Sequence, residues 1–455
     1  MSDNVAPMTP VQRRFLNRVT LTCAWGEGVD GFDLGILAVV LPAIKTELNA
    51  TPVELGLIGA SSLIGLFFGA PIVGLLSDRF GRKNLFTIDL ILFVILGGMQ
   101  AIVTEPWQLF VVRVLLGITI GAEYSLGAAM LAEFVPSHGR GTRMASMLLC
   151  WYFGYLIAVA GGFAMVDLLG WHWRWVLAFS AVPAIITLLM RIGIPESPRW
   201  LKHNGQEEQA KAIVDKYLGE GYYHAEAIDA EGKRPSGMRE LLRGENFKRL
   251  AFCCVLWAAN VGPFFAIFTF APSVLKSLNI QNEVLGTIIL NSFAALGAIL
   301  GMLALERFGR RKQTLFTFAV TTPALALIGI WSNAPAWVVV ALFAAFALCN
   351  AAQGNLTVLY PAEILPTEVR ATGVGVAAAF SRISAAAGTF LLPIGIATIG
   401  IAPCMLIGAG ILLIGWIYSH FEAPETTGLT LTAVSHGKLE AMPHHVDHVS
   451  HEAIP

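Results

Sequence analysis

The chain has 455 residues, of which 55% are hydrophobic and 13% are charged, and its formal net charge is −1. Soluble domains carry about 25% charged residues, so the composition excludes an ordinary soluble protein and predicts one that crosses a membrane many times. No nucleic-acid partner is expected.

Twelve apolar segments are each long enough to cross the ~30 Å hydrocarbon core of a bilayer. Glycine and proline are frequent inside these segments, and neighbouring helices can satisfy the backbone groups that they leave unpaired. We therefore predict an all-α membrane protein with twelve transmembrane helices. The six cysteines fall inside these segments without CxxC spacing, so neither a metal site nor a disulfide framework nor a cofactor is expected. The expected limits are 19–44, 55–77, 84–104, 107–134, 143–167, 174–193, 250–275, 284–305, 313–332, 336–359, 372–396 and 399–420.

Basic residues gather in alternate connections between these segments. Lysine and arginine in short loops favour the cytoplasmic side, so we predict a multi-pass protein of the cell inner (plasma) membrane with both termini in the cytoplasm. The other connections carry little beyond Lys45, Arg174 and Lys276. The residues that set this orientation are Arg13, Arg14, Arg18, Arg79, Arg82, Lys83, Arg140, Arg143, Arg307, Arg310, Arg311, Lys312 and Arg370.

Three acidic residues lie in the first predicted helix, at Glu27, Asp30 and Asp33. Each costs about 2.5–3.5 kcal/mol at the centre of a membrane helix, so they are expected to face a wet cavity or to carry protons. Residues three apart share a helix face, so the three trace a slowly turning stripe. We predict that they take up and release protons. The alternative is a structural acid paired with an arginine.

A short basic hairpin, Gly74 to Lys83, separates the second and third helices, and its order returns in the second half of the chain. The two Arg-Phe-Gly-Arg runs begin at Arg79 and Arg307, 228 positions apart. The pair Glu133 and Arg140 is repeated 230 positions later. Recurrence at nearly the same offset indicates an internal repeat. Ion pairs that hold one conformational state are predicted for Asp78, Arg82, Glu133, Arg140, Glu306, Arg310, Glu363 and Arg370.

The repeat predicts two similar domains joined by a polar linker. The expected domains are a six-helix bundle over 1–198, a cytoplasmic linker with a short amphipathic helix over 199–249, a second bundle over 250–428 and a polar tail over 429–455. The tail carries five histidines. A solvated tail and a metal-binding tail both fit this composition.

The fourth predicted helix combines small residues with charges. Gly117 and Gly121, four residues apart, permit close helix contact. Arg113 and Glu123 lie near one face at different depths. Glu123 is a second candidate proton carrier, and Arg113 is a candidate partner of an acid in the first helix.

Polar residues also occur in the second half at membrane depth. Arg382, in the eleventh helix, is a lone arginine among small residues, and its planar fork matches a carboxylate, so we predict that it binds an anion. Tyr152 and Trp257 are expected to stack on an apolar or aromatic substrate body. Other candidate substrate contacts are Asn260, Asn291, Asn350, Gln353 and Asn355; a helix–helix hydrogen bond is the alternative for each.

The two-fold repeat resembles the major facilitator superfamily of secondary transporters. That resemblance covers nearly the whole chain and implies two pseudo-symmetric six-helix bundles with a substrate site at their interface near the bilayer midplane. The runs that begin at Pro195 and Pro424 resemble sugar-porter signatures. The paired glutamines of sugar porters are absent from the seventh helix, which reads Trp257-Ala258-Ala259-Asn260.

Other motifs are similar to those of anion carriers. The run Asp30-Gly31-Phe32-Asp33 resembles the helix-one signature of aromatic acid:proton symporters. Gly121-Ala122-Glu123, Arg370-Ala371-Thr372-Gly373 and Phe380-Ser381-Arg382-Ile383 resemble nicotinate-type and organic-ion carriers. In some of those carriers the arginine at the position of Arg382 takes part in substrate binding.

These patterns predict a monomeric, proton-coupled symporter of a small organic anion, such as an aromatic or other monocarboxylate, that works by alternating access. Three alternatives stay open: a sugar or polyol:proton symporter, a drug or metabolite:proton antiporter, and a transporter-like receptor that binds without turnover. An enzyme is not expected, because the chain has no nucleophile–base constellation and no cofactor loop.

Overall fold

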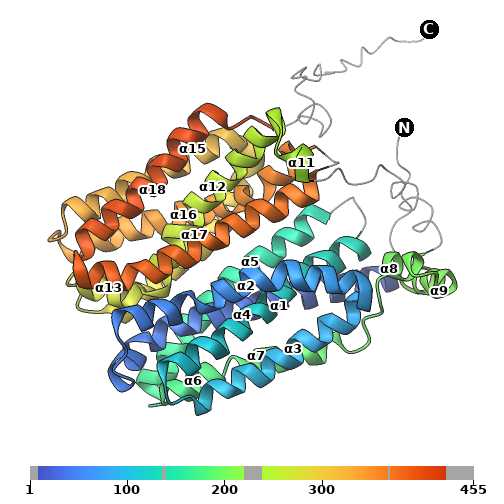
Figure 1. The fold of residues 1–455 in the computed structure, drawn as a ribbon, viewed down its shortest axis with the longest axis horizontal. Coiled ribbons are helices and arrows are strands. Elements are labelled where there is room, and N and C mark those ends of the chain that lie inside the picture. The colour runs from blue at the N-terminus through green and yellow to red at the C-terminus, as the bar shows by residue number, and fades with distance from the viewer. Residues whose placement is uncertain (1–8, 136–139, 220–237, 367–368, 427–455) are drawn as a thin grey trace, which may run out of the picture.

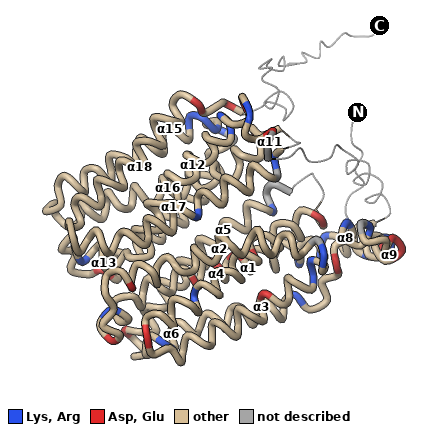
Figure 2. The backbone as a smooth tube through the Cα atoms, viewed as in Figure 1, with Lys and Arg blue, Asp and Glu red and all other residues tan. Residues whose placement is uncertain are grey.

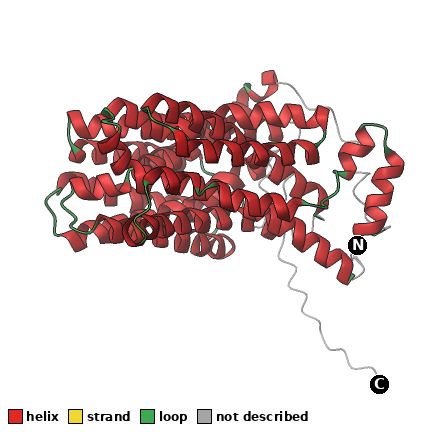
Figure 3. Ribbon diagram, turned by 90° about the horizontal axis from the view of Figure 1, so that it is seen from below, coloured by secondary structure: helices red, strands yellow, loops and turns green. Residues whose placement is uncertain are grey.

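The computed structural model describes residues 9–135, 140–219, 238–366 and 369–426 (Figure 1). Throughout these residues the chain forms helices joined by short connections, without a strand (Figure 3). Eleven segments are long and apolar enough to span a membrane. The twelfth is α1, whose charged residues make it more polar than the others. The prediction of an all-α membrane protein with twelve spanning helices is confirmed.

The helices follow the predicted order along the chain. The first half contains α1 (Pro10–Glu47), α2 (Pro52–Phe80), α3 (Arg82–Met99), α4 (Pro106–Phe134), α5 (Arg140–Phe163), α6 (Trp173–Ala178) and α7 (Ala181–Arg191). The linker contains α8 (Pro198–His203), α9 (Glu207–Tyr217) and α11 (Met238–Leu241). The second half contains α12 (Gly244–Thr269), α13 (Ala271–Ser277), α14 (Glu283–Phe308), α15 (Arg310–Ile330), α16 (Ala336–Ile364), α17 (Arg370–Thr398) and α18 (Ile401–Glu422).

Two predicted spans are divided into two helices each. The sixth span breaks between α6 and α7, just before Pro183, and the seventh breaks at Phe270, just before Pro272. Proline cannot donate a backbone hydrogen bond and clashes with the preceding helical turn, which makes a break possible at both places. The first span is longer than predicted, because α1 is one unbroken helix of 38 residues.

The two halves repeat the same helix pairings, which is the structural form of the sequence repeat. In the first half α1 packs on α5, α2 on α4, and α3 on α7. In the second half the corresponding pairs are α12 with α17, α14 with α16, and α15 with α18. The main contacts between the halves are α2 with α17 and α5 with α14, and α1 adds smaller contacts with α12 and α13. Figure 1 shows the resulting two bundles lying side by side.

Glycines make the closest of these pairings possible. A Cβ atom on Gly31 of α1 would meet the backbone of Trp151 in α5, and one on Gly117 of α4 would meet the backbone of Ser62 in α2. Such close backbone approach is how helices associate in lipid, where no hydrophobic force drives one helix against another and van der Waals packing takes its place. The predicted role of Gly117 in close helix contact is therefore supported.

The bundles touch at one end of the interface and separate at the other. Near the start of α2, a Cβ on Gly56 would meet the backbone of Phe390 in α17. Gly74 follows Gly56 by 18 residues, which is five turns, so it lies on the same face about 27 Å further along α2. There, a Cβ on Gly74 or on Gly375 of α17 would have no other heavy atom within 4 Å. The interface is therefore open toward the end that carries the turns at Gly81 and Gly309.

Charged residues concentrate at the ends of the bundles, with few in between (Figure 2). At one end each half carries the same cap. The carboxylate of Glu196 accepts hydrogen bonds from the backbone N–H groups of Arg82 and Lys83 at the start of α3, at 3.0–3.1 Å. Glu425 accepts from the corresponding groups of Arg310 and Arg311, at 3.0 and 3.2 Å. The repeated signatures therefore anchor helix N-termini, where a negative charge also complements the helix dipole.

Replacing Glu196 by alanine is expected to lower the free energy of unfolding by roughly 1–2 kcal/mol, the upper range for loss of a helix cap. Thermal unfolding of the purified protein in detergent measures this change. Glu208, an exposed residue in the first turn of α9, provides the control. Equal effects of Glu196→Ala and Glu208→Ala would show that the cap does not stabilise the bundle.

Candidate functional site

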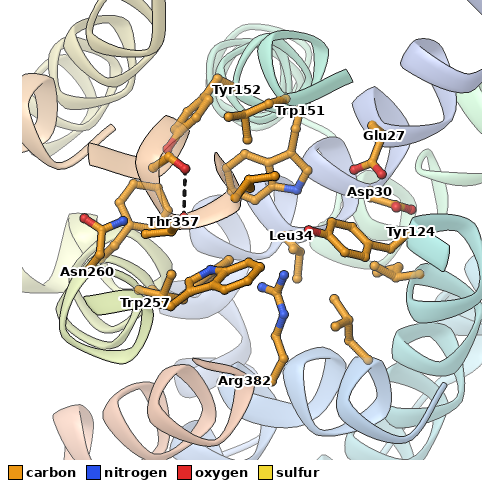
Figure 4. Close-up of a pocket in the computed structure, with 18 of the residues that line it drawn as sticks. Glu27, Asp30, Leu34, Tyr124, Trp151, Tyr152, Trp257, Asn260, Thr357 and Arg382 are labelled. Atoms are coloured by element: carbon orange, nitrogen blue, oxygen red, sulfur yellow. Dashed lines mark hydrogen bonds between the residues drawn. The ribbon is translucent and has the colours of Figure 1, made fainter. Parts of the chain in front are cut away.

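A cavity lies between the bundles at the middle of the helices. It encloses about 710 Å³, including its open mouth. The first bundle contributes residues from α1, α2, α4 and α5, and the second from α12, α16 and α17 (Figure 4). Among the residues predicted from sequence, those that line it are Glu27, Asp30, Tyr152, Trp257, Asn260, Asn350 and Arg382. The predicted site at the interface of the halves thus corresponds to a real cavity.

Arg382 brings a positive charge from the second bundle to face acids of the first. Its guanidinium points into the cavity and lies 5.5 Å from the centre of the Tyr124 ring (Figure 4). It is close enough to act electrostatically on the carboxyl of Glu27. Asp30 lies one turn further along α1 and also lines the cavity. The cavity therefore has a guanidinium on one side and two carboxyl groups on the other.

Aromatic side chains form much of the remaining wall. Trp151 packs edge-on against Tyr152, with ring centres 5.1 Å apart, and against Phe265 at 5.9 Å. Tyr152 in turn meets Phe264 at 6.2 Å, and Trp257 completes the wall from α12. Large rings held by one another present fixed apolar faces. Trp151 and Phe264 were not singled out from the sequence, because an aromatic residue in a membrane helix most often faces lipid or core.

Amide groups of the second bundle supply hydrogen-bond acceptors. The side chain of Asn350 donates to the backbone carbonyl of Asn260 at 3.0 Å. The side-chain oxygens of both asparagines are buried and receive no hydrogen bond within the described chain, and the same is true of Asp30 Oδ2. Buried acceptors are nearly always satisfied in proteins. Three residues that line the cavity therefore each carry an acceptor that lacks a donor.

Three other predicted substrate contacts are not brought to this cavity. Asn291 donates to the carbonyl of Thr287 in its own helix, at 2.9 Å. Asn355 donates to Ala298 at 3.0 Å, joining α16 to α14. Gln353 accepts from Thr317, joining α16 to α15. The alternative stated from sequence, a helix–helix hydrogen bond, describes Asn355 and Gln353, whereas Asn291 bonds within its own helix.

Asp33 lies deeper in the first bundle than the other two acids of α1. It is fully buried and pairs with Arg113 of α4, with Nη2 to Oδ2 at 3.1 Å. Arg113 also donates to Gln100 at 3.0 Å and to the backbone carbonyl of Asp33 at 3.3 Å. Arg113 thus pairs with an acid of the first helix, which is one of the two possibilities that the sequence left open for these acids.

Glu123 has a different arginine partner. It forms an ion pair with Arg191 at the end of α7, and Arg191 also contacts Asp89 of α3 at 3.3 Å. Neither Arg191 nor Asp89 was singled out from the sequence. The signal was present, since both are ionisable residues within apolar spans. A charge near a helix end is usually solvated, however, and only the fold turns Arg191 inward.

The predicted gating residues form ion pairs within each bundle. Arg82 at the start of α3 pairs with Glu133 at the end of α4. Arg310 and Glu363 form the corresponding pair in the second bundle, at 3.2 Å. Arg370 donates to the backbone carbonyl of Leu365 at 3.1 Å. Glu133 thus pairs with Arg82, and its predicted pairing with Arg140 stays a prediction. The Arg82–Glu133 and Arg310–Glu363 pairs each join helices of one bundle. The side chains of Asp78, Arg140 and Glu306 lie outside the described residues, as does the tail from 427.

Comparison with known proteins identifies the family. The profile of the family described as "Sugar (and other) transporter" matches residues 19–437. The chain belongs to this family. It is 37% identical over 417 residues to the putative metabolite transport protein YaaU of Escherichia coli, covering 90% of this chain and 93% of that protein. It is 33% identical over 421 residues to the inner membrane metabolite transport protein YgcS of the same organism, covering 92% and 94%.

Solved structures show the same fold. The proton:xylose symporter XylE, bound to 6-bromo-6-deoxy-D-glucose, matches with a TM-score of 0.75 at 22% identity, covering 94% of this chain and 100% of that one. An inward-open form of XylE from E. coli matches with a TM-score of 0.77 at 20% identity, covering 92% and 99%. The chain is therefore a multi-pass secondary transporter of the major facilitator superfamily and not an enzyme. The sugar-porter resemblance is confirmed. The resemblance to aromatic acid, nicotinate-type and organic-ion carriers is not confirmed by these matches and stays a prediction.

Proposed function

We propose that the chain is a proton-coupled symporter of sugars or related polyols. The observation that carries this proposal is that three residues lining the cavity, Asn260, Asn350 and Asp30, each hold a buried acceptor without a donor in the described chain. A polyol brings several hydroxyl donors, whereas a simple aromatic carboxylate brings none. The aromatic faces of the wall suit the C–H faces of a sugar ring. The family description and the xylose named for XylE agree with this substrate class.

A small organic anion is the second candidate, and Arg382 favours it. A guanidinium at membrane depth forms two parallel hydrogen bonds to a carboxylate. The same fork can donate to two neighbouring hydroxyls, so the arginine is compatible with both substrate classes. The two substrate classes differ at Asn260 and Asn350: the hydroxyls of a polyol can donate to these side-chain oxygens, and a simple carboxylate cannot.

Asp30 is the acid best placed to carry the proton. It is buried, lines the cavity and has an oxygen without a donor. An ionised carboxylate in that position is costly, so we expect Asp30 to take up a proton when the cavity closes around the substrate, and the neutral carboxyl still accepts a hydrogen bond from the substrate. Glu27 shares the cavity, while Asp33 is held by Arg113. Sodium fits less well, because a sodium cage usually adds carbonyls from a broken helix, and α1 is continuous through Gly28 and Gly31.

The transport cycle follows from the geometry of the interface. We assign the open end to the cytoplasm, because the basic turns lie there, and this assignment places both termini inside the cell. Substrate and proton would close this end by binding more tightly to the closed arrangement, since a ligand shifts an equilibrium only by its differential affinity. A single chain contains both bundles and is proposed to work as a monomer. Its proposed parts are bundles over 1–198 and 250–428, a linker over 199–249 and a tail over 429–455.

Asn260→Ala is expected to weaken binding of the preferred polyol about tenfold, the effect of losing one hydrogen bond worth about 1.4 kcal/mol. Ligand-induced thermal stabilisation, measured with myo-inositol, xylose, glucose, benzoate and nicotinate, gives both the substrate class and the affinity. Asn291→Ala removes an equally buried amide away from the cavity and is the matched control. Stabilisation by the carboxylates alone would replace the polyol proposal by the organic anion.

A further inference from the structure

A second group of ionisable side chains lies inside the first bundle, beside the cavity. Arg191 of α7 lies between Glu123 of α4 and Asp89 of α3, contacting both carboxylates. Its guanidinium lies 3.3 Å from the centre of the Phe86 ring and donates to the Phe86 carbonyl. The exposed fractions are 3% for Glu123 and 5% for each of the other two. This buried trio is called the Arg191 cluster below.

The Arg191 cluster has one more acid than base. The side chains of Asp89 and Glu123 lie within hydrogen-bonding distance of each other. Two ionised carboxylates would repel at that distance, whereas a carboxyl donates to a carboxylate through a shared proton. Asp89 Oδ2 and Glu123 Oε1 receive no hydrogen bond within the described chain. One proton would supply the missing donor and make the cluster neutral, with one carboxylate paired to Arg191.

The position of the Arg191 cluster connects it with the cavity. Glu123 Oε1 lies against Gly26 of α1, the neighbour of Glu27. The carboxyls of Glu27 and Asp30 lie close enough to act electrostatically on Glu123, and Asp30 on Asp89. Cys23 of α1 also faces Glu123 and Arg191. Arg191 ends α7 at the open end of the bundle, so the cluster lies between the cavity acids and that end.

We infer that Asp89 and Glu123, held by Arg191, form a second proton-binding site, which passes the transported proton between the cavity acids and the open end of the bundle. The binding of one proton follows from the contacts of the cluster. Its part in transport rests on the proposed proton coupling. Glu123 was already a candidate proton carrier, and the structure adds Asp89 as the group with which it shares the proton and Arg191 as the group that positions both.

Infrared difference spectroscopy tests the shared proton directly. The carboxylic-acid C=O band of one group is expected in the parent and should be lost in both Asp89→Asn and Glu123→Gln, because the remaining carboxylate is then neutralised by Arg191. Each variant keeps one acid for Arg191, so the bundle is expected to fold. Asp167→Asn makes the same change at an exposed position and should keep the band. An unchanged band in both cluster variants would overturn the inference.

Transport measurements test the relay. At a fixed pH gradient in proteoliposomes, Asp89→Asn and Glu123→Gln are expected to slow accumulation at least about tenfold, equivalent to 1.4 kcal/mol. Substrate exchange, which requires no net proton movement, should stay near the parent rate. Accumulation at the parent rate in both variants would overturn the relay. A parent that does not respond to the pH gradient would instead contradict the proposed function, and the infrared result would still decide whether the cluster holds a proton.

Discussion

Replacing Arg382 by alanine is expected to lower substrate affinity at least about a hundredfold, because hydrogen bonds from a charged group contribute about 1.5–3 kcal/mol each and the guanidinium can make two. Arg382→Lys keeps the charge and loses the planar fork, so a loss of about tenfold is expected from one hydrogen bond. Uptake of labelled substrate by cells, normalised to the amount of protein in the membrane, measures both changes.

Arg14, an exposed arginine of α1, provides the matched control for both substitutions. Arg14→Ala and Arg14→Lys should transport like the parent. If Arg382→Lys also transports like the parent, the fork of Arg382 does not contact the substrate. A loss confined to carboxylate substrates would assign Arg382 to the organic-anion candidate and leave polyol binding to the asparagines and aromatic rings.

Arg113→Ala is expected to destabilise the protein more than any other single change considered. The substitution leaves Asp33 buried and ionised without its partner, and breaking a buried ion pair in this way costs about 3–5 kcal/mol. It also removes the donor to Gln100. Thermal unfolding of the purified protein in detergent, with no substrate present, measures the loss of stability.

A double substitution separates the charge from the packing. Arg113→Gln combined with Asp33→Asn removes both charges and keeps polar groups of similar size, so it should recover much of the stability lost in Arg113→Gln alone. Arg14→Ala, at an exposed position, should change stability by less than about 0.5 kcal/mol. A single Arg113 variant as stable as Arg14→Ala would show that the pair does not stabilise the bundle.

The fold could be predicted from sequence because lipid imposes simple rules. An apolar segment of sufficient length must form a helix, and the recurrence of Arg-Phe-Gly-Arg at Arg79 and Arg307 fixes the two-fold repeat. Helix breaks were harder to predict. Many prolines here are tolerated inside helices, and only packing decides that the chain breaks near Pro183 and Pro272 but continues past Pro263.

The site was predictable where a residue is unusual for a membrane helix. Glu27, Asp30 and Arg382 stand out because a charge at membrane depth is costly, and all three line the cavity. Asn260 and Asn291 look alike in sequence, but one faces the cavity and the other bonds its own helix, since the face of each helix is set by its neighbours. The partner of Glu123 could not be predicted, because α7 places Arg191 beside Glu123 only when it packs against α1 and α3 in the folded bundle.

The most direct test of proton-coupled symport is uptake into proteoliposomes under an imposed pH gradient. With the interior more alkaline, the protein is expected to accumulate its substrate, to lose accumulation on addition of a protonophore, and to be unaffected when potassium replaces sodium. Asp30→Asn should retain exchange and lose accumulation, because a neutral side chain mimics the protonated acid. An antiporter would be driven by the opposite gradient. Sodium-dependent accumulation that a protonophore does not reduce at fixed membrane potential would contradict the mechanism.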